Sequence, residues 1–108
     1  MSGVEQQTEL PQPARAEIRI EQVLAALGDP VRLLFVRQLA QAPAVGVACG
    51  VIPLPVTKST RTHHLRILRE AGVISMRAEG TRRMACLRRD DLDALYPGLL
   101  DGILGAPH

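Results

Sequence analysis

Residues 57–88 read TKSTRTHHLRILREAGVISMRAEGTRRMACLR, and this stretch decides how the chain folds. Thr57 is suited to cap a helix that runs from residue 58 to about residue 71, and Gly72 is suited to end it. Residues 73–76 and 84–87 are predicted to form two strands. The turn between them lies around residues 79–81, where Gly80 can take a positive φ angle. We therefore expect a polar-faced helix followed directly by a short β-hairpin.

The same stretch carries most of the positive charge of the chain. Residues 58–89 contain nine of the thirteen basic residues against two acids, a sum of +7. Residues 1–57 sum to −1 and residues 90–108 to −4, so the net charge of +2 conceals a strong segregation. A localised positive surface indicates a polyanionic partner, most often nucleic acid. The alternative is a solvated basic surface with no partner, which the tight clustering on one helix and one hairpin disfavours.

Two helices are predicted ahead of this stretch. In the first, residues 16–27, the side chains of Ile20, Val23, Leu24 and Leu27 form a single apolar stripe. Gly28 ends this helix.

The second helix starts at Asp29 and Pro30, which are suited to the N-cap and the first helical position, and it closes at Pro43. The following residues 44–56, AVGVACGVIPLPV, contain two glycines and two prolines that oppose a long helix. Because this segment has no charged residue, we expect a short irregular turn of helix or a short strand that is largely buried.

A last helix is predicted after the hairpin, with Asp90 or Asp91 as its cap. Its apolar residues are Leu92, Leu95, Leu99, Leu100, Ile103 and Leu104. Pro97 and Gly98 are expected to break or kink it near Tyr96.

All these elements fit one domain, since 108 residues lie within the usual size range. Residues 1–14 are polar and contain two prolines, so we predict a disordered N-terminal tail, followed by the domain over residues 15–106. One Phe, one Tyr and no Trp argue against single-stranded nucleic acid, which stacks its bases on aromatic side chains. No apolar run approaches a membrane span, and the start lacks the pattern of a secretory signal. We expect a cytoplasmic protein with no membrane partner and with both cysteines reduced.

The order of these elements is that of a winged helix-turn-helix, mainly α with a small β-hairpin. Residues 27–39 (LGDPVRLLFVRQL), 58–74 (KSTRTHHLRILREAGVI) and 79–92 (EGTRRMACLRRDDL) resemble the ArsR/SmtB-type bacterial transcriptional repressors. The similarity covers roughly residues 20–104. It implies a homodimer that binds a palindromic operator in double-stranded DNA and leaves it when an inducer, not identified by the residues, binds. Two features depart from the family. Its members usually have a regular helix, which carries a cysteine motif in the metal sensors, where this chain has VACGVIPLPV. They usually have a small aliphatic residue at the position of Arg61.

Candidate DNA contacts follow from this interpretation, because the N-terminal part of the second helix of a helix-turn-helix meets the base edges in the major groove. Long basic side chains of the hairpin can enter the minor groove or bind the backbone. Two residues have a structural alternative: Thr57 as a simple helix cap, and His64 as a packed, hydrogen-bonded histidine. The candidate DNA-binding residues are Lys58, Ser59, Thr60, Arg61, Thr62, His63 and Arg66 in the helix and Arg77, Thr81, Arg82 and Arg83 in the hairpin.

The first and last helices are the expected dimer surface, because they carry more apolar side chains than one small core can cover. A two-fold dimer would present two recognition helices about one DNA turn apart. The candidate interface residues are Ile20, Val23, Leu24, Leu95, Leu99, Leu100 and Ile103.

The sequence favours neither a metal site nor an enzyme. The adjacent His63 and His64 project about 100° apart on a helix and cannot share one ion, and no zinc-type spacing occurs. No nucleophile or phosphate-loop motif occurs either. We therefore expect no metal and no cofactor.

Two alternatives remain open beside a simple repressor. Cys49 and Cys86 could form a thiol switch that answers to a redox inducer, although buried, inert cysteines are commoner. A winged helix that only contacts other proteins is the other alternative, and a neutral recognition helix would mark it.

Overall fold

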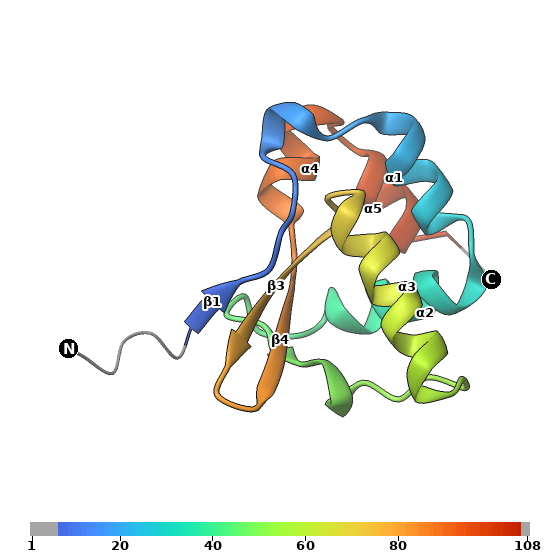
Figure 1. The fold of residues 1–108 in the computed structure, drawn as a ribbon. Coiled ribbons are helices and arrows are strands. Elements are labelled where there is room, and N and C mark those ends of the chain that lie inside the picture. The colour runs from blue at the N-terminus through green and yellow to red at the C-terminus, as the bar shows by residue number, and fades with distance from the viewer. Residues whose placement is uncertain (1–6, 107–108) are drawn as a thin grey trace.

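The computed structural model describes residues 7–106, in which helices surround one end and one side of a small antiparallel sheet (Figure 1). The elements follow the winged-helix order that the sequence predicts. In chain order they are β1 (Gln7–Glu9), η2 (Arg15–Glu17), α1 (Ile20–Leu27), α2 (Pro30–Leu39), β2 (Val47–Ala48), η3 (Cys49–Val51), α3 (Lys58–Glu70), β3 (Ile74–Glu79), β4 (Arg82–Leu87), α4 (Arg89–Leu95) and α5 (Leu99–Leu104).

Local signals define the helix-turn-helix pair α2 and α3. The Asp29 carboxylate accepts hydrogen bonds from the backbone N–H groups of Val31 and Arg32 at 2.9 and 3.0 Å, so it caps α2 as expected. Thr57 caps α3 by accepting from Thr60 N at 3.3 Å. Gly72, with φ of +84°, turns the chain from α3 into β3. The prediction of this helix from Thr57 to Gly72 is confirmed to within one residue.

The hairpin of β3 and β4 forms the wing, and its strands are longer than predicted. Their register pairs Ile74 with Leu87 and Glu79 with Arg82, and Gly80 takes φ of +60° in the turn. The outer, charged half of the hairpin continues the ladder because backbone hydrogen bonds do not require apolar side chains. The full strand order is β1-β3-β4-β2.

The core lies between the helices and the inner half of the wing. Its largest fully buried side chains include Phe35 from α2, Leu68 from α3, Ile74 from β3, and Leu92 and Leu100 from α4 and α5. At about 25 cal/mol per Å² of apolar surface, such buried apolar side chains supply most of the stability of a domain this size.

The prediction of a disordered tail over residues 1–14 is wrong for residues 7–14, and residues 1–6 lie outside the described part of the chain. Residues 7–18, here called the N-terminal arm, lie along the sheet and then cross towards α1 (Figure 1). β1 pairs with β3 in antiparallel register, with Glu9 opposite Arg77. This strand could not be predicted from the sequence because its residues are polar and show no apolar alternation. It forms because its backbone pairs with a strand that is distant in sequence.

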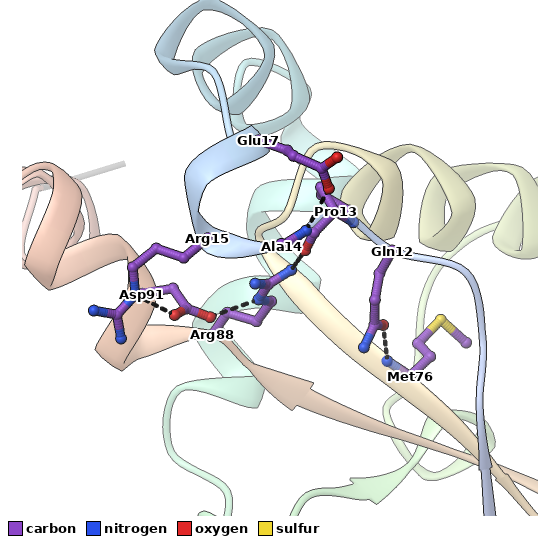
Figure 2. Close-up of polar contacts among 8 residues, drawn as sticks. All are labelled: Gln12, Pro13, Ala14, Arg15, Glu17, Met76, Arg88 and Asp91. Carbon is purple, nitrogen blue, oxygen red and sulfur yellow. Dashed lines mark hydrogen bonds and ion pairs between the residues drawn. The ribbon is translucent and has the colours of Figure 1, made fainter.

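Polar contacts continue the attachment of the arm beyond β1 (Figure 2). Met76 N donates to Gln12 Oε1 at 3.0 Å, and Arg88 Nη1 donates to Pro13 O at 2.6 Å. Arg88 Nε also donates to Asp91, whose other oxygen accepts from Arg15 at 2.7 Å. Burial works to raise the pKa of Asp91, but the hydrogen bonds from Arg15 and Arg88 outweigh it, so the pKa lies below its ordinary value. The arm is therefore a fixed part of the domain.

Three further expectations need correction. The first helix begins at Ile20, because η2 and extended residues precede it and bury Ile18 against Gly72. The segment 44–56 is not largely buried: it forms β2 and η3, and Val45 and Val51 are each 70% exposed. The last helix has neither aspartate as its cap, since both lie in the first turn of α4. The break at Pro97 and Gly98 is confirmed and divides α4 from α5.

Among residues 7–106, no helix has both the length and the apolar character needed to cross a bilayer.

Candidate nucleic-acid interface

The solvent-facing side of α3 presents polar and basic side chains from its start to Arg66. All are exposed and all belong to the predicted DNA-binding set: Lys58, Ser59, Thr60, Thr62, His63 and Arg66. The Thr60 hydroxyl accepts a hydrogen bond from Thr57 at 2.9 Å, and the Thr62 hydroxyl donates to Lys58 O at 3.1 Å. These local bonds make the first turn a well-ordered helix start.

Within α3, Arg61 is the member of the predicted set that does not face solvent freely. Its Nη1 donates to the carbonyl oxygens of Cys49 and Ile52 at 2.9 and 2.8 Å, and the residue is half-buried. The guanidinium thus ties η3 to α3. A small aliphatic residue could not make these bonds, so the unusual Arg61 and the unusual segment VACGVIPLPV belong to one local arrangement.

The wing supplies exposed cations near the same side of the molecule. Thr81, Arg82 and Arg83 are exposed at the tip. Arg77 is half-buried instead, because Nε contacts Glu79 at 2.9 Å and Nη2 donates to Val45 O at 2.9 Å. Arg77 therefore bonds within the domain, whereas Arg82 and Arg83 are exposed to solvent.

A hollow of about 470 Å³ lies between α3 and the wing. The start of α3, η3 and the wing tip all lie along the lower edge of Figure 1. The basic residues that line the hollow are Lys58, Arg61, Arg66, Arg69, Arg82 and Arg83. No acidic residue is among the described residues of the lining. We refer to this feature as the α3–wing hollow.

Other cations of the +7 stretch are used inside the domain. Arg69 donates to Pro11 O in the arm, and Arg88 joins the arm to α4. Arg89 contacts Asp101 at 3.0 Å, which links α4 to α5. The charge therefore divides into arginines with internal partners and a smaller group that remains available at α3 and the wing tip.

The two adjacent histidines have different surroundings. The His64 side chain is 12% exposed, and its Nδ1 lies 3.1 Å from Arg32 Nη1 and 3.9 Å from Asp29 Oδ2. The interpretation of His64 as a packed, hydrogen-bonded residue is confirmed, while His63 is exposed. Among residues 7–106 no group of three His, Cys, Asp or Glu side chains is arranged to hold a metal ion.

The predicted dimer residues divide into core and surface. Val23 and Leu100 are 0% and 1% exposed, so their assignment to an interface is wrong: they fill the core of their own chain. Ile20 and Leu24, one helical turn apart on α1, are 37% and 48% exposed. Leu95, Leu99 and Ile103 are half-buried and pack against the core. Leu34 of α2 is also 38% exposed, although nothing in its helical spacing distinguishes it from its buried neighbours.

The two cysteines are free and lie at different places along the β2–β4 edge. The register pairs Val47 with Ala85, so Cys86 lies beside Gly46, three residues from Cys49. Three extended residues span about 10 Å, beyond the reach of a disulfide. Burial raises the pKa of the Cys49 thiol, which opposes reactivity. An internal disulfide therefore does not fit this geometry.

Comparisons with known proteins agree with this architecture. No protein-family model matches the chain. A helix-turn-helix-type transcriptional regulator of Bacillus subtilis is 30% identical over 82 residues, which cover 74% of this chain and 81% of that protein. One of Methanocaldococcus jannaschii is 37% identical over 60 residues, 56% of this chain and 67% of that protein. The chain belongs to the helix-turn-helix transcriptional regulators. It is a regulator and not an enzyme.

The fold of this helix-turn-helix regulator is that of the ArsR type. The crystal structure of an ArsR family transcriptional regulator matches it with a TM-score of 0.63 at 20% identity, over 77% of this chain and 90% of that one. The resemblance found in the sequence and the winged-helix fold expected from it are confirmed.

Proposed function

We propose that this regulator is a repressor that binds double-stranded DNA sequence-specifically, as a homodimer on a palindromic operator, and is released by an inducer in the cytoplasm. One observation carries the proposal: exposed cations of α3 and of the wing tip line one hollow, and none of the described residues in its lining is acidic. A positive, concave surface beside a free helix start suits the DNA backbone and major groove.

Base reading is assigned to the leading turns of α3. Lys58 can donate to guanine, and Ser59 and Thr62 can adapt to several base edges. We assign Arg66, about two helical turns further along, to a contact with a DNA phosphate. The wing cations Arg82 and Arg83 bind the adjacent backbone or minor groove.

The sequence predicts Arg61 and Arg77 as DNA contacts, and this proposal gives them a structural role instead. Both are bound to carbonyl oxygens of the segment 44–56. We assign them the positioning of η3 and the wing relative to α3, rather than contacts with DNA.

Dimerisation is proposed through α1 and the α4–α5 region. Ile20 and Leu24 form an exposed apolar pair on α1, and Leu99 and Ile103 are the half-buried members on α5. A second copy related by a two-fold axis would bury such a patch and would repeat α3 about one DNA turn away, roughly 34 Å.

The test is fluorescence anisotropy with a duplex taken from upstream of the gene for this regulator. We expect saturable binding that weakens on the order of 10³-fold between low and moderate salt, as roughly 6–10 phosphate contacts require. Arg66→Ala should weaken binding about tenfold or more, since each protomer of the dimer loses one phosphate contact.

Arg19→Ala is the matched control, because Arg19 has an exposed side chain that contacts Glu21 on the α1 side. It should bind the duplex like the parent protein. Equal loss in both variants, or binding that salt does not weaken, would contradict the assignment of α3 to DNA.

A further inference from the structure

The α3–wing hollow has an apolar floor that DNA binding does not explain. Leu10 of the arm, Leu65 of α3 and Met76 of β3 line it together with Cys49 and Val51 of η3. Val51 is 70% exposed although its side chain is wholly apolar. A phosphate backbone requires cations and hydrogen-bond donors, whereas an apolar floor gains free energy only by covering carbon.

Exposed cations surround that floor. Lys58 and Arg66 lie on the α3 side, and Arg82 and Arg83 on the wing side; all four are exposed. With no acidic residue in the described lining, the potential in the hollow favours an anion.

Arg69 adds a further positive charge to the same lining. Its Nη1 donates to Pro11 O, and its buried Nε has no hydrogen-bond partner among the described residues. Because that Nε is buried, Arg69 acts on an anion in the hollow through its charge rather than through a hydrogen bond from this atom.

We propose that the α3–wing hollow is a binding site for a small amphipathic anion, a molecule with an apolar body and one carboxylate or sulfonate group. The body covers the floor around Val51, and the anionic group lies among the rim cations. The volume of about 470 Å³ is within the range of pockets that hold small molecules.

One consequence rests on the proposed function. The ligand occupies the surface assigned to DNA and neutralises cations needed by phosphates, so ligand and operator exclude each other directly. Release would then need no rearrangement of the dimer.

Anilinonaphthalene sulfonate is a suitable probe, because it joins an apolar body to one anionic group and its fluorescence rises in apolar surroundings. We expect saturable binding to the full chain with one site per chain. The neutral analogue phenylnaphthylamine, which has the same body without the sulfonate, should bind at least about tenfold more weakly, because it gains nothing from the cations.

Val51→Glu should weaken the probe about tenfold or more, because it places a negative charge in the floor. The matched control is Val45→Glu, since Val45 is equally exposed at 70% but does not line the hollow. It should bind the probe like the parent. Both are surface positions, where a substitution leaves the fold largely unaffected.

The α1 patch is the competing location for an apolar probe, and Leu24→Glu tests it. Loss of binding in Leu24→Glu with none in Val51→Glu would overturn the site. In the parent protein, the probe should also raise the apparent Kd for the duplex linearly with free probe concentration, by a factor of one plus the ratio of that concentration to the Kd of the probe, as direct competition requires. Probe binding that depends on Val51 but leaves a bound duplex in place would overturn direct exclusion. A chain that binds the probe but no duplex would refute the proposed function while supporting the site.

Discussion

Gly72 combines two demands that only glycine meets at once. Its φ is +84°, and a Cβ at this position would lie 2.5 Å from Cγ1 of Ile18. The backbone angle ends α3, and the missing side chain lets Ile18 and Pro13 of the arm lie close to this glycine. This one glycine therefore allows both the end of α3 and the close packing of the N-terminal arm against it.

Gly72→Ala should destabilise the domain by about 2–5 kcal/mol: about 1–2 for the left-handed backbone and roughly 1–3 for displacing Ile18. Gly98→Ala is the matched control, because Gly98 has the same φ of +84° with open space around it, and only the first cost applies. Urea denaturation of both variants measures the difference. Equal costs would mean that the close approach of Ile18 has no energetic importance.

Asp29 acts at the start of α2. The N–H of Arg32 is the largest of the influences that hold the pKa of its carboxyl below the ordinary value. A lowered pKa means that the ionised cap stabilises the folded state fully above the unfolded-state pKa, about 3.9, and that this contribution is lost as pH falls through the folded-state pKa.

Asp29→Ala should cost about 1 kcal/mol of unfolding free energy at pH 7, as loss of an N-cap does. The gap between parent and variant should narrow as pH falls below about 4. Urea denaturation over this range measures it, with the exposed Glu70→Ala as the control. A gap that stays constant down to pH 3 would mean that the ionised cap is not what stabilises α2.

At the scale of elements, the arm joins the sheet to α4. β1 pairs with β3, and Leu10 N donates to Met76 O. Arg88 then bonds both Pro13 of the arm and Asp91 of α4 (Figure 2). Because Arg88 is only 11% exposed on its side chain, its hydrogen bonds compete little with water.

Arg88→Ala should loosen the arm while the helices remain folded. Hydrogen–deuterium exchange of residues 7–18 should accelerate about tenfold, the factor that corresponds to a lost hydrogen bond of about 1.4 kcal/mol. Arg89→Ala removes the neighbouring arginine, which contacts Asp101 instead, and should leave the arm protected. Acceleration throughout the domain, or in both variants alike, would show that Arg88 does not act on the arm in particular.

At the scale of the whole molecule, the core and the proposed dimer surface share the same helices. Leu24 is 48% exposed, whereas Val23 beside it is fully buried. The exposed apolar residues of α1 are therefore the ones available to a second copy.

Leu24→Glu should convert the dimer to a chain of 11.7 kDa in sedimentation analysis. Affinity for a palindromic duplex should fall by about 10²-fold or more, since two half-sites are no longer engaged together. Val45→Glu introduces the same charge on another surface and should remain dimeric. A parent protein that sediments as a single chain would contradict the dimer itself.

Residues close in sequence carried the successful predictions. Asp29, Thr57 and Gly72 act on backbone groups within a few positions, so the start of α2 and both ends of α3 follow from local rules, whereas α2 ends at Leu39 and not at the predicted Pro43. The polar spacing of α3 was enough to predict which of its residues are exposed. The half-buried positions of Arg61 and Arg77 could not be predicted, because their partners are carbonyl oxygens 9 to 32 positions away that no local pattern indicates.

The order of helices, the hairpin and the accumulation of cations on α3 and the wing were determined by the sequence itself, because caps, turn glycines and residue spacing act over short distances. Only the tertiary structure decided which of those cations remain free, that a polar segment becomes β1, and that Val23 is core while Val51 is exposed. Those outcomes depend on which backbone groups and apolar surfaces, distant in sequence, come into contact when the chain packs.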